Sequence, residues 1–111
     1  MLRGFEMKKF IYRRPRYRVD VPVIVHLTPL YSTCGRCTDV SAEGLGVRLA
    51  EQAPVGDIVM VEFLLRGHPV RAKARVEYCC DDIYHGLRFE LSSLQEQDCV
   101  REMIESIQSI T

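Results

Sequence analysis

Apolar and charged side chains alternate without interruption between residues 70 and 78. Successive side chains of a β-strand point to opposite faces, so this pattern predicts a strand with one buried and one charged face. The apolar set is Val70, Ala72, Ala74, Val76 and Tyr78, and the charged set is Arg71, Lys73, Arg75 and Glu77. It is the clearest strand pattern in the chain.

Five further segments have strand patterns, and short turn signals separate them. Pro22 lies inside the first segment, which indicates an edge position or a strand start. The fourth is apolar on both faces apart from Glu62, which predicts a central strand. Gly44 and Gly46 mark a bend or bulge in the third. The predicted strands span residues 19–27, 31–40, 44–49, 58–65 and 87–91.

The apolar period changes to three and four residues near the end of the chain, which predicts an amphipathic helix over about residues 94–110. Ser93 and Glu96 form a capping box before it. The fold class is therefore all-β with a helical addition: a six-stranded antiparallel β-barrel with a C-terminal α-helix. The stripe is expected to pack on the barrel, although part of it could form a homodimer or partner surface. It contains Leu94, Val100, Met103, Ile104, Ile107 and Ile110.

A chain of 111 residues is long enough for one domain with a short tail. We expect a basic arm over residues 1–12 and the barrel domain over 13–111. The net charge of zero hides an asymmetry, because residues 1–18 carry seven cations against Glu6 alone. Such an arm favours an anionic partner, namely a nucleotide, a nucleic acid or anionic lipid, over a merely solubilising tail.

Other classes of protein are disfavoured by composition. No apolar stretch approaches the roughly 20 residues of a membrane span, and the first 30 residues lack the apolar core of a secretory signal. Five cysteines are an odd number, which argues against a disulfide framework and favours a reducing, cytoplasmic location.

An arginine pair at spacing four lies just before the first predicted strand. Arg14 and Arg18 form an R-x-x-x-R pattern, which Arg13 precedes, and Pro15 favours an extended or turning backbone there. The planar guanidinium donates two parallel hydrogen bonds to phosphate, can reach the O6 and N7 acceptors of guanine, and can stack on a base. By itself this spacing is common in basic segments.

A second polar group follows residues 31–40. Asp39 can accept hydrogen bonds from the N–H donors of a guanine edge, and Ser41 can donate and accept. Gly44 allows either a positive φ or the close approach of a ligand. An ordinary hydrogen-bonded hairpin loop would use the same residues.

The two groups together resemble the motifs of the PilZ domain family. R-x-x-x-R is followed by D-x-S-x-x-G, which leads into Gly44-Leu45-Gly46-Val47. Gly86-Leu87-Arg88-Phe89 resembles the closing strand of the family, and the terminal helix falls where the family has one. The resemblance covers about residues 13–110 and implies a six-stranded barrel with helical additions.

The resemblance also implies a function. Many PilZ domains are receptors for the bacterial second messenger cyclic di-GMP, which would be relayed to a downstream protein in processes such as motility or biofilm formation. Arg14, Arg18, Asp39, Ser41 and Gly44 carry over as ligand contacts. Arg13 is associated with binding a stacked pair of ligand molecules. The alternative is a protein-interaction adaptor of the same fold, in motility or pilus assembly, that binds no ligand.

Catalytic and metal chemistry have weak support in the sequence. Cys34 and Cys37 have metal-ligand spacing, and Cys79 with Cys80 could complete a zinc site, but a second C-x-x-C is missing. Cys99 in the predicted helix is expected in the core. The three histidines are scattered, and no nucleophile with a base is recognisable, so we expect no enzyme, no cofactor and no metal. Nucleic-acid binding is also disfavoured, because the body outside the arm is acidic.

Overall fold

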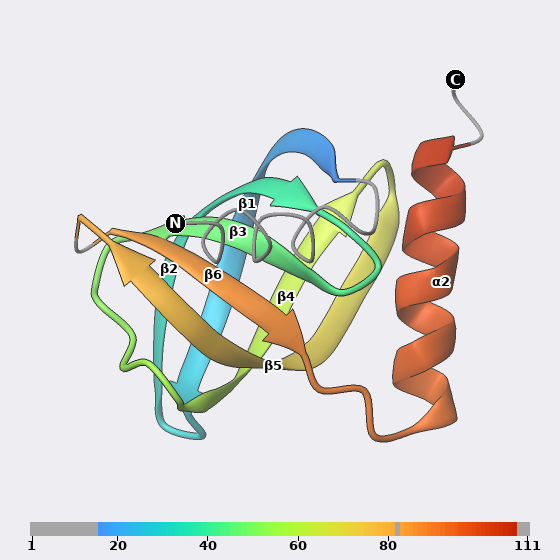
Figure 1. Ribbon diagram of the computed structural model, residues 1–111. Coiled ribbons are helices and arrows are strands. Elements are labelled where there is room, and N and C mark those ends of the chain that lie inside the picture. The colour runs from blue at the N-terminus through green and yellow to red at the C-terminus, as the bar shows by residue number, and fades with distance from the viewer. Residues whose placement is uncertain (1–15, 82, 109–111) are drawn as a thin grey trace, which may run out of the picture.

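The computed structural model describes residues 16–81 and 83–108 (Figure 1). The expected arm over residues 1–12, Arg13, Arg14 and the last residues of the expected helix lie outside this part of the chain. The elements are β1 (Tyr17–Thr28), β2 (Tyr31–Val40), β3 (Gly44–Leu49), β4 (Ile58–Leu65), β5 (His68–Cys80), β6 (Tyr84–Phe89) and α2 (Leu94–Gln108).

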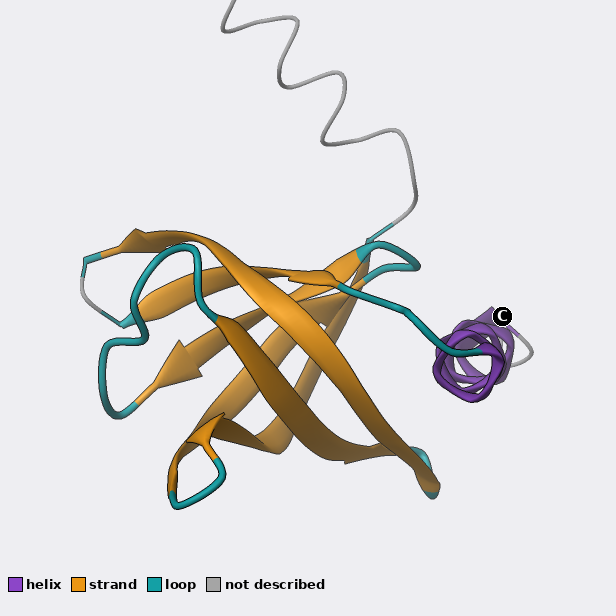
Figure 2. Cartoon of the chain, turned by 90° about the horizontal axis from the view of Figure 1, so that it is seen from below, coloured by secondary structure: helices purple, strands orange, loops and turns teal. Residues whose placement is uncertain are grey.

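The six strands close into an antiparallel barrel in the order β1-β2-β3-β6-β5-β4. This confirms the predicted fold class. Closure pairs β1 with β4, so every strand has two neighbours. Figure 2 shows the strands crossing around a common interior, with α2 to one side.

The interior of the barrel is filled by the inward half of each alternating pattern. In β5 the four predicted residues from Val70 to Val76 are at most 1% exposed. Burial of small and branched side chains from all six strands gives one continuous core. The charged half of the β5 pattern faces outward, as predicted.

Three strands have bounds that differ from the prediction. The first runs from Tyr17 to Thr28 rather than over residues 19–27. The last strand runs from Tyr84 to Phe89, so Leu91 lies beyond it, since the apolar alternation continues past the pairing with β5. The fifth begins at His68, and only Arg66 and Gly67 form the turn, both with positive φ. The bounds of β4 are as predicted, but its burial alternates although its sequence is apolar on both faces, and Leu64 is 59% exposed.

Pro22 lies within β1 rather than at its start. Its register partner on β2 is Arg36, whereas the pairing of β1 with β4 begins only at Val23. The segment around Pro22 is therefore an edge on the β4 side, which is where a residue without an N–H is tolerated.

The helix α2 packs against β5 through Val100, Met103 and Ile107, whereas Leu94 is 77% exposed and is not part of the packed stripe. The cap is confirmed, because the Glu96 N–H donates to Ser93 Oγ at 3.1 Å. The Glu96 carboxylate also accepts from backbone N–H groups of Ser92 and of Lys73 on β5, which ties the start of the helix to the barrel.

A buried histidine holds the connection between β3 and β4. His85 is 0% exposed, its Nε2 accepts from the Ala53 N–H at 3.0 Å, and its Nδ1 donates to the Ile83 carbonyl at 2.9 Å. Both ring nitrogens are thus satisfied within the protein, which makes His85 a structural residue.

Candidate functional site

A row of register partners crosses four strands on the outer surface of the barrel. Asp39 of β2 pairs with Gly46 of β3, Gly46 pairs with Gly86 of β6, and Gly86 pairs with Tyr78 of β5. The two central positions have no side chains. The row is therefore a shallow trough with a carboxylate at one end and an aromatic ring at the other.

The carboxylate end depends on a bulge in β2. Cys37 pairs with Val47 and Asp39 with Gly46, so β2 has one extra residue, Thr38, at this point. Strict alternation would place Asp39 on the same face as Cys37, whose side chain is fully buried inside the barrel. The bulge turns Asp39 outward instead.

The aromatic end depends on a similar bulge in β5. Val76 pairs with Leu87 and Tyr78 with Gly86, which leaves Glu77 as the extra residue. The sequence pattern placed Tyr78 on the buried face, and this is wrong: the side chain is 43% exposed. The bulge reverses the alternation after Val76, and no sequence period reveals it.

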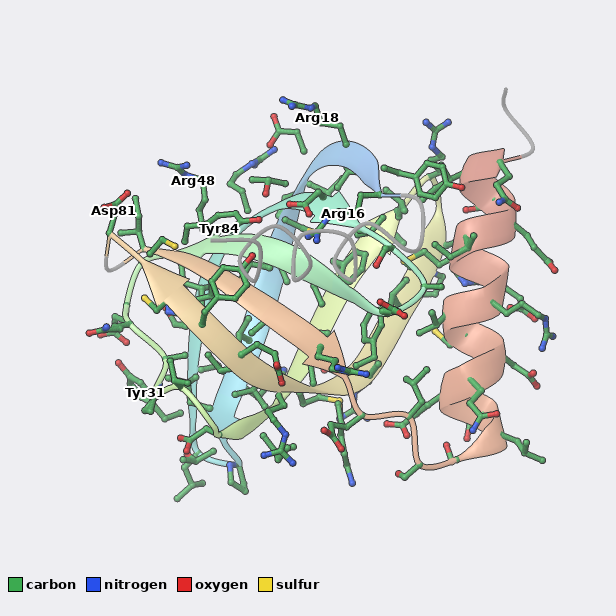
Figure 3. All side chains as sticks on the ribbon, viewed as in Figure 1. Arg16, Arg18, Tyr31, Arg48, Asp81 and Tyr84 are labelled. Carbon is green, nitrogen blue, oxygen red and sulfur yellow. The ribbon has the colours of Figure 1, made fainter. Side chains whose placement is uncertain are left out.

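Three side chains hold the Asp39 carboxylate. Its Oδ1 accepts from Tyr84 Oη at 3.0 Å and from Thr38 Oγ1 at 2.9 Å. Its Oδ2 accepts from Arg16 Nε at 3.0 Å and also from a terminal nitrogen of the same guanidinium. In Figure 3 the labelled Arg16 and Tyr84 lie over the barrel, whereas Arg18 extends away from it at the top of the view.

The two glycines provide the room for this arrangement. A Cβ at Gly46 would lie 2.1 Å from Tyr84 Oη and 2.3 Å from Asp39 Oδ1, and a Cβ at Gly86 would lie 2.3 Å from the ring of Tyr78. The two tyrosine rings cross the trough with centroids 6.3 Å apart. Any side chain at either glycine would displace the tyrosine beside it.

Charge reinforces the network. Partial burial works against the charge of Arg16, but the hydrogen bond and negative charge of Asp39 outweigh it and raise the pKa of the guanidinium. Burial, followed by the charge of Asp39, raises the pKa of Tyr84 well above its ordinary value. The phenol therefore keeps its proton and remains a hydrogen-bond donor to Asp39.

A pocket of about 510 Å³ opens at the carboxylate end. Arg18 and Asp39 are register partners on β1 and β2, and both line it. Within residues 16–81 and 83–108 Arg18 has no hydrogen-bond or ion-pair partner, so a cation stands free beside a held carboxylate. The pocket is lined by Arg16, Tyr17, Arg18, Thr38, Asp39, Tyr78 and Tyr84.

Ser41 and Gly44 shape the loop that follows the pocket but do not line it. Ser41 Oγ accepts from the N–H groups of Glu43 at 3.1 Å and of Gly44 at 3.3 Å, and the Ser41 N–H donates to the Gly44 carbonyl at 2.8 Å. Gly44 does not have positive φ. Its missing side chain allows close approach of β6, because a Cβ there would lie 2.0 Å from the Leu87 carbonyl oxygen.

The cysteines do not converge. Cys37 lies inside the barrel, where burial raises the pKa of its thiol to about 12, and Cys34 is exposed on the other face of β2. Cys99 is only partly buried, although it packs against the core. The described residues contain no cluster of three His, Cys, Asp or Glu side chains suited to a metal. No helix among them has the length and apolar character to cross a membrane.

Sequence reasoning pointed to Arg18 and Asp39 and missed the other five residues that line the pocket, among them Tyr17 at the start of β1. Arg16 was visible as part of the arginine-rich run, yet its spacing matched neither motif. Thr38, Tyr78 and Tyr84 had no motif at all, because only the strand register brings them to Asp39.

Comparison with known proteins agrees with this architecture. The family profile of the PilZ domain matches residues 12–106. The PilZ domain of CeSA from a cellulose-synthesizing bacterium is similar in structure, with a TM-score of 0.72 and 18% identity over 85% of this chain and 98% of that one. No curated protein sequence matches significantly.

Two solved structures with bound cyclic di-GMP are also similar. The PilZ domain of YcgR from Escherichia coli has a TM-score of 0.69 and 15% identity, over 87% of this chain and 91% of that one. Longer YcgR, also in complex with cyclic di-GMP, has a TM-score of 0.71 and 18% identity, and the match covers 87% of this chain but 46% of that one. PilZ domains are binding domains rather than enzymes, and cyclic di-GMP receptors are among them. The chain described here belongs to the PilZ domain family.

Proposed function

We propose that this chain binds cyclic di-GMP at the pocket beside Asp39 and relays binding to a downstream protein. The observation that carries the proposal is the placement of Arg18 and Asp39, one from each motif, as register partners that line the same pocket. Its volume of about 510 Å³ lies within the usual range for small-ligand sites.

The chemistry of the pocket suits the two parts of the ligand. Arg18 is a free cation at its mouth and can form charge-assisted bonds to a phosphate. Asp39 offers a carboxylate to the N–H donors of guanine. Ser41 and Gly44 support the site by fixing the loop after Asp39, in addition to any direct contact with the ligand.

The remaining contacts are assigned to the arginines before β1. Arg14 completes the first motif, and Arg13 is the residue expected to favour a stacked pair of ligand molecules. Both lie outside the described residues. The stretch from residue 1 to residue 18 carries a net charge of +6, which matches a dianionic ligand.

Calorimetry with cyclic di-GMP, GTP and a short single-stranded oligonucleotide tests the proposal. We expect saturable binding of cyclic di-GMP alone, and its heat also gives the number of ligand molecules per chain. Absence of binding by a folded protein would favour the adaptor function, and binding of the oligonucleotide would redirect the assignment to nucleic acid.

Amide exchange tests the relay. With the ligand we expect new protection over residues 10–20 and 39–46, because the basic segment would close over the pocket, and little change over 70–76 inside the wall of the barrel. Exchange that stays as fast in residues 10–20 would contradict a relay through this segment.

A further inference from the structure

Arg16 lies between the two arginines of the first motif and belongs to neither motif. It nevertheless makes the most extensive side-chain contact in the pocket, with two of its nitrogens donating to Asp39 Oδ2. The side chains of Arg16 and Asp39 are 31% and 20% exposed, so the pair is partly withdrawn from water. The inference that follows rests on the proposed function.

The Asp39 carboxylate has one oxygen to offer a ligand. Oδ1 is already held by Tyr84 and Thr38, whereas Oδ2 faces the arginine. A guanidinium presents adjacent N–H donors in one plane, and the edge of guanine that carries N1–H and the N2 amino group presents the same pattern. Arg16 therefore satisfies the carboxylate in the way in which guanine would.

We propose that Arg16 is an affinity-determining residue that occupies the guanine position in the ligand-free protein. Cyclic di-GMP must displace the Arg16 guanidinium before guanine can reach Asp39. The apparent dissociation constant is then the intrinsic constant divided by the fraction of chains in which Arg16 has left the carboxylate. Removing Arg16 raises that fraction to one.

The direction of the change in affinity distinguishes a competitor from a cation that only attracts the ligand. Loss of any cation near an anionic ligand weakens binding, whereas loss of a competitor strengthens it. Arg16→Met retains much of the apolar stem and removes the donors and the charge. Arg36→Met is the matched control, because Arg36 of β2 also pairs with an acidic residue, Asp20 of β1, at 2.8 Å and outside the pocket.

Calorimetry with cyclic di-GMP on the wild type and both variants provides the first test. An exposed or half-exposed pair of this kind is worth about 1 kcal/mol, so Arg16→Met should bind about fivefold more tightly than the wild type. Arg36→Met should bind like the wild type or slightly more weakly. Thermal unfolding confirms that both variants are folded.

Nuclear magnetic resonance of the Arg16 Nε–H provides the second test. Its signal should be protected from exchange with water in the free protein and should lose that protection when cyclic di-GMP saturates the site. The competitor role is overturned if Arg16→Met binds no more tightly than Arg36→Met, or if the protected signal persists in the saturated complex. If the wild type does not bind cyclic di-GMP, the proposed function itself is wrong. If the wild type binds but Arg16→Met binds no more tightly, only the competitor role of Arg16 is wrong.

Discussion

Two carboxylates on the outer surface of the barrel accept an arginine Nε at the same distance of 3.0 Å, yet only Asp39 lines the pocket of about 510 Å³. Asp39 is held by Arg16, Tyr84 and Thr38. On β4, which like β2 is a neighbour of β1, Glu62 accepts from Arg71 and makes a 3.1 Å contact with His26.

The neighbours of the two carboxylates explain the difference. The register partners of Glu62 are Ile24 and Arg71, and both have side chains that cover the surface around it. Asp39 lies beside Gly46, with Gly86 next in the row. An ion pair alone therefore does not make a candidate site. At Asp39 the glycines leave room for Tyr84 and Tyr78, whose side chains line the pocket together with the carboxylate.

Replacing each of the two acidic residues by alanine should give the largest difference in ligand affinity. Asp39→Ala removes the proposed acceptor for guanine, and we expect cyclic di-GMP to bind about 100-fold more weakly, or about 3 kcal/mol. The preference over cyclic di-AMP should narrow, because adenine lacks the matching pair of donors. Glu62→Ala should leave binding unchanged in calorimetry. If Asp39→Ala and Glu62→Ala lost the same affinity for cyclic di-GMP, the proposal that the ligand binds beside Asp39 would be contradicted.

Replacing the arginine beside each carboxylate should likewise weaken ligand binding at Asp39 and leave it unchanged at Glu62. Arg18→Ala removes a free cation from the pocket, so we expect a loss of about 2 kcal/mol in the free energy of binding if it contacts phosphate. Arg71→Ala removes a cation that is already paired with Glu62, outside the pocket. Fluorescence or calorimetric titration of the folded variants measures both affinities for cyclic di-GMP. If Arg18→Ala bound as tightly as the wild type, Arg18 would not be a ligand contact.

A methyl group in the trough should act through Tyr84. Gly46→Ala places a carbon 2.1 Å from Tyr84 Oη and 2.3 Å from Asp39 Oδ1, so both side chains must move. We expect about tenfold weaker binding, with a loss of stability of order 1 kcal/mol. Gly67→Ala is the control, because it adds strain at a φ of 81° in a turn with open space around it. It should lower stability without lowering affinity, as urea unfolding and calorimetry on both variants would show.

The smallest effect concerns pH at the second carboxylate. The hydrogen bond from Arg71, with a further contribution from His26, lowers the pKa of Glu62. As the pH falls, the unfolded chain takes up this proton first, so the stabilisation exists above the ordinary carboxyl range and is lost as the pH drops through the folded pKa.

Glu62→Gln should therefore flatten the fall in stability on acidification by at most about 0.5 kcal/mol, because the pair is exposed. Urea unfolding at pH 7 and pH 4 measures this, with the exposed Glu77→Gln as control. A larger effect in the control would show that the Glu62 pair is not the cause.

Much of the barrel could be predicted because period-two alternation is a local property. The second, third and fourth strands were predicted with the correct bounds, and the helix start followed from Ser93 and Glu96. Two errors arise where the alternation of the sequence does not follow the pairing of the strands. Leu91 continues the apolar pattern beyond the end of β6, and Tyr78 follows a bulge that reverses its face.

The candidate site was predictable only in part for a related reason. Arg18 and Asp39 carry chemistry in a recognisable spacing, so the sequence points to both. The hydrogen bonds of Tyr84 and Arg16 to Asp39 depend on contacts between residues 45 and 23 positions apart in the chain. No spacing rule within one segment contains that information.

The bulges at Thr38 and Glu77 have a consequence for engineering. A designer who grafts the motif residues onto another six-stranded barrel at the same linear spacing, without the extra residue, would deliver the aspartate into the hydrophobic interior. A carboxylate there would be unpaired and costly, and the recipient would unfold rather than gain a binding site. A successful graft must therefore transfer the additional residue of each strand together with the side chains.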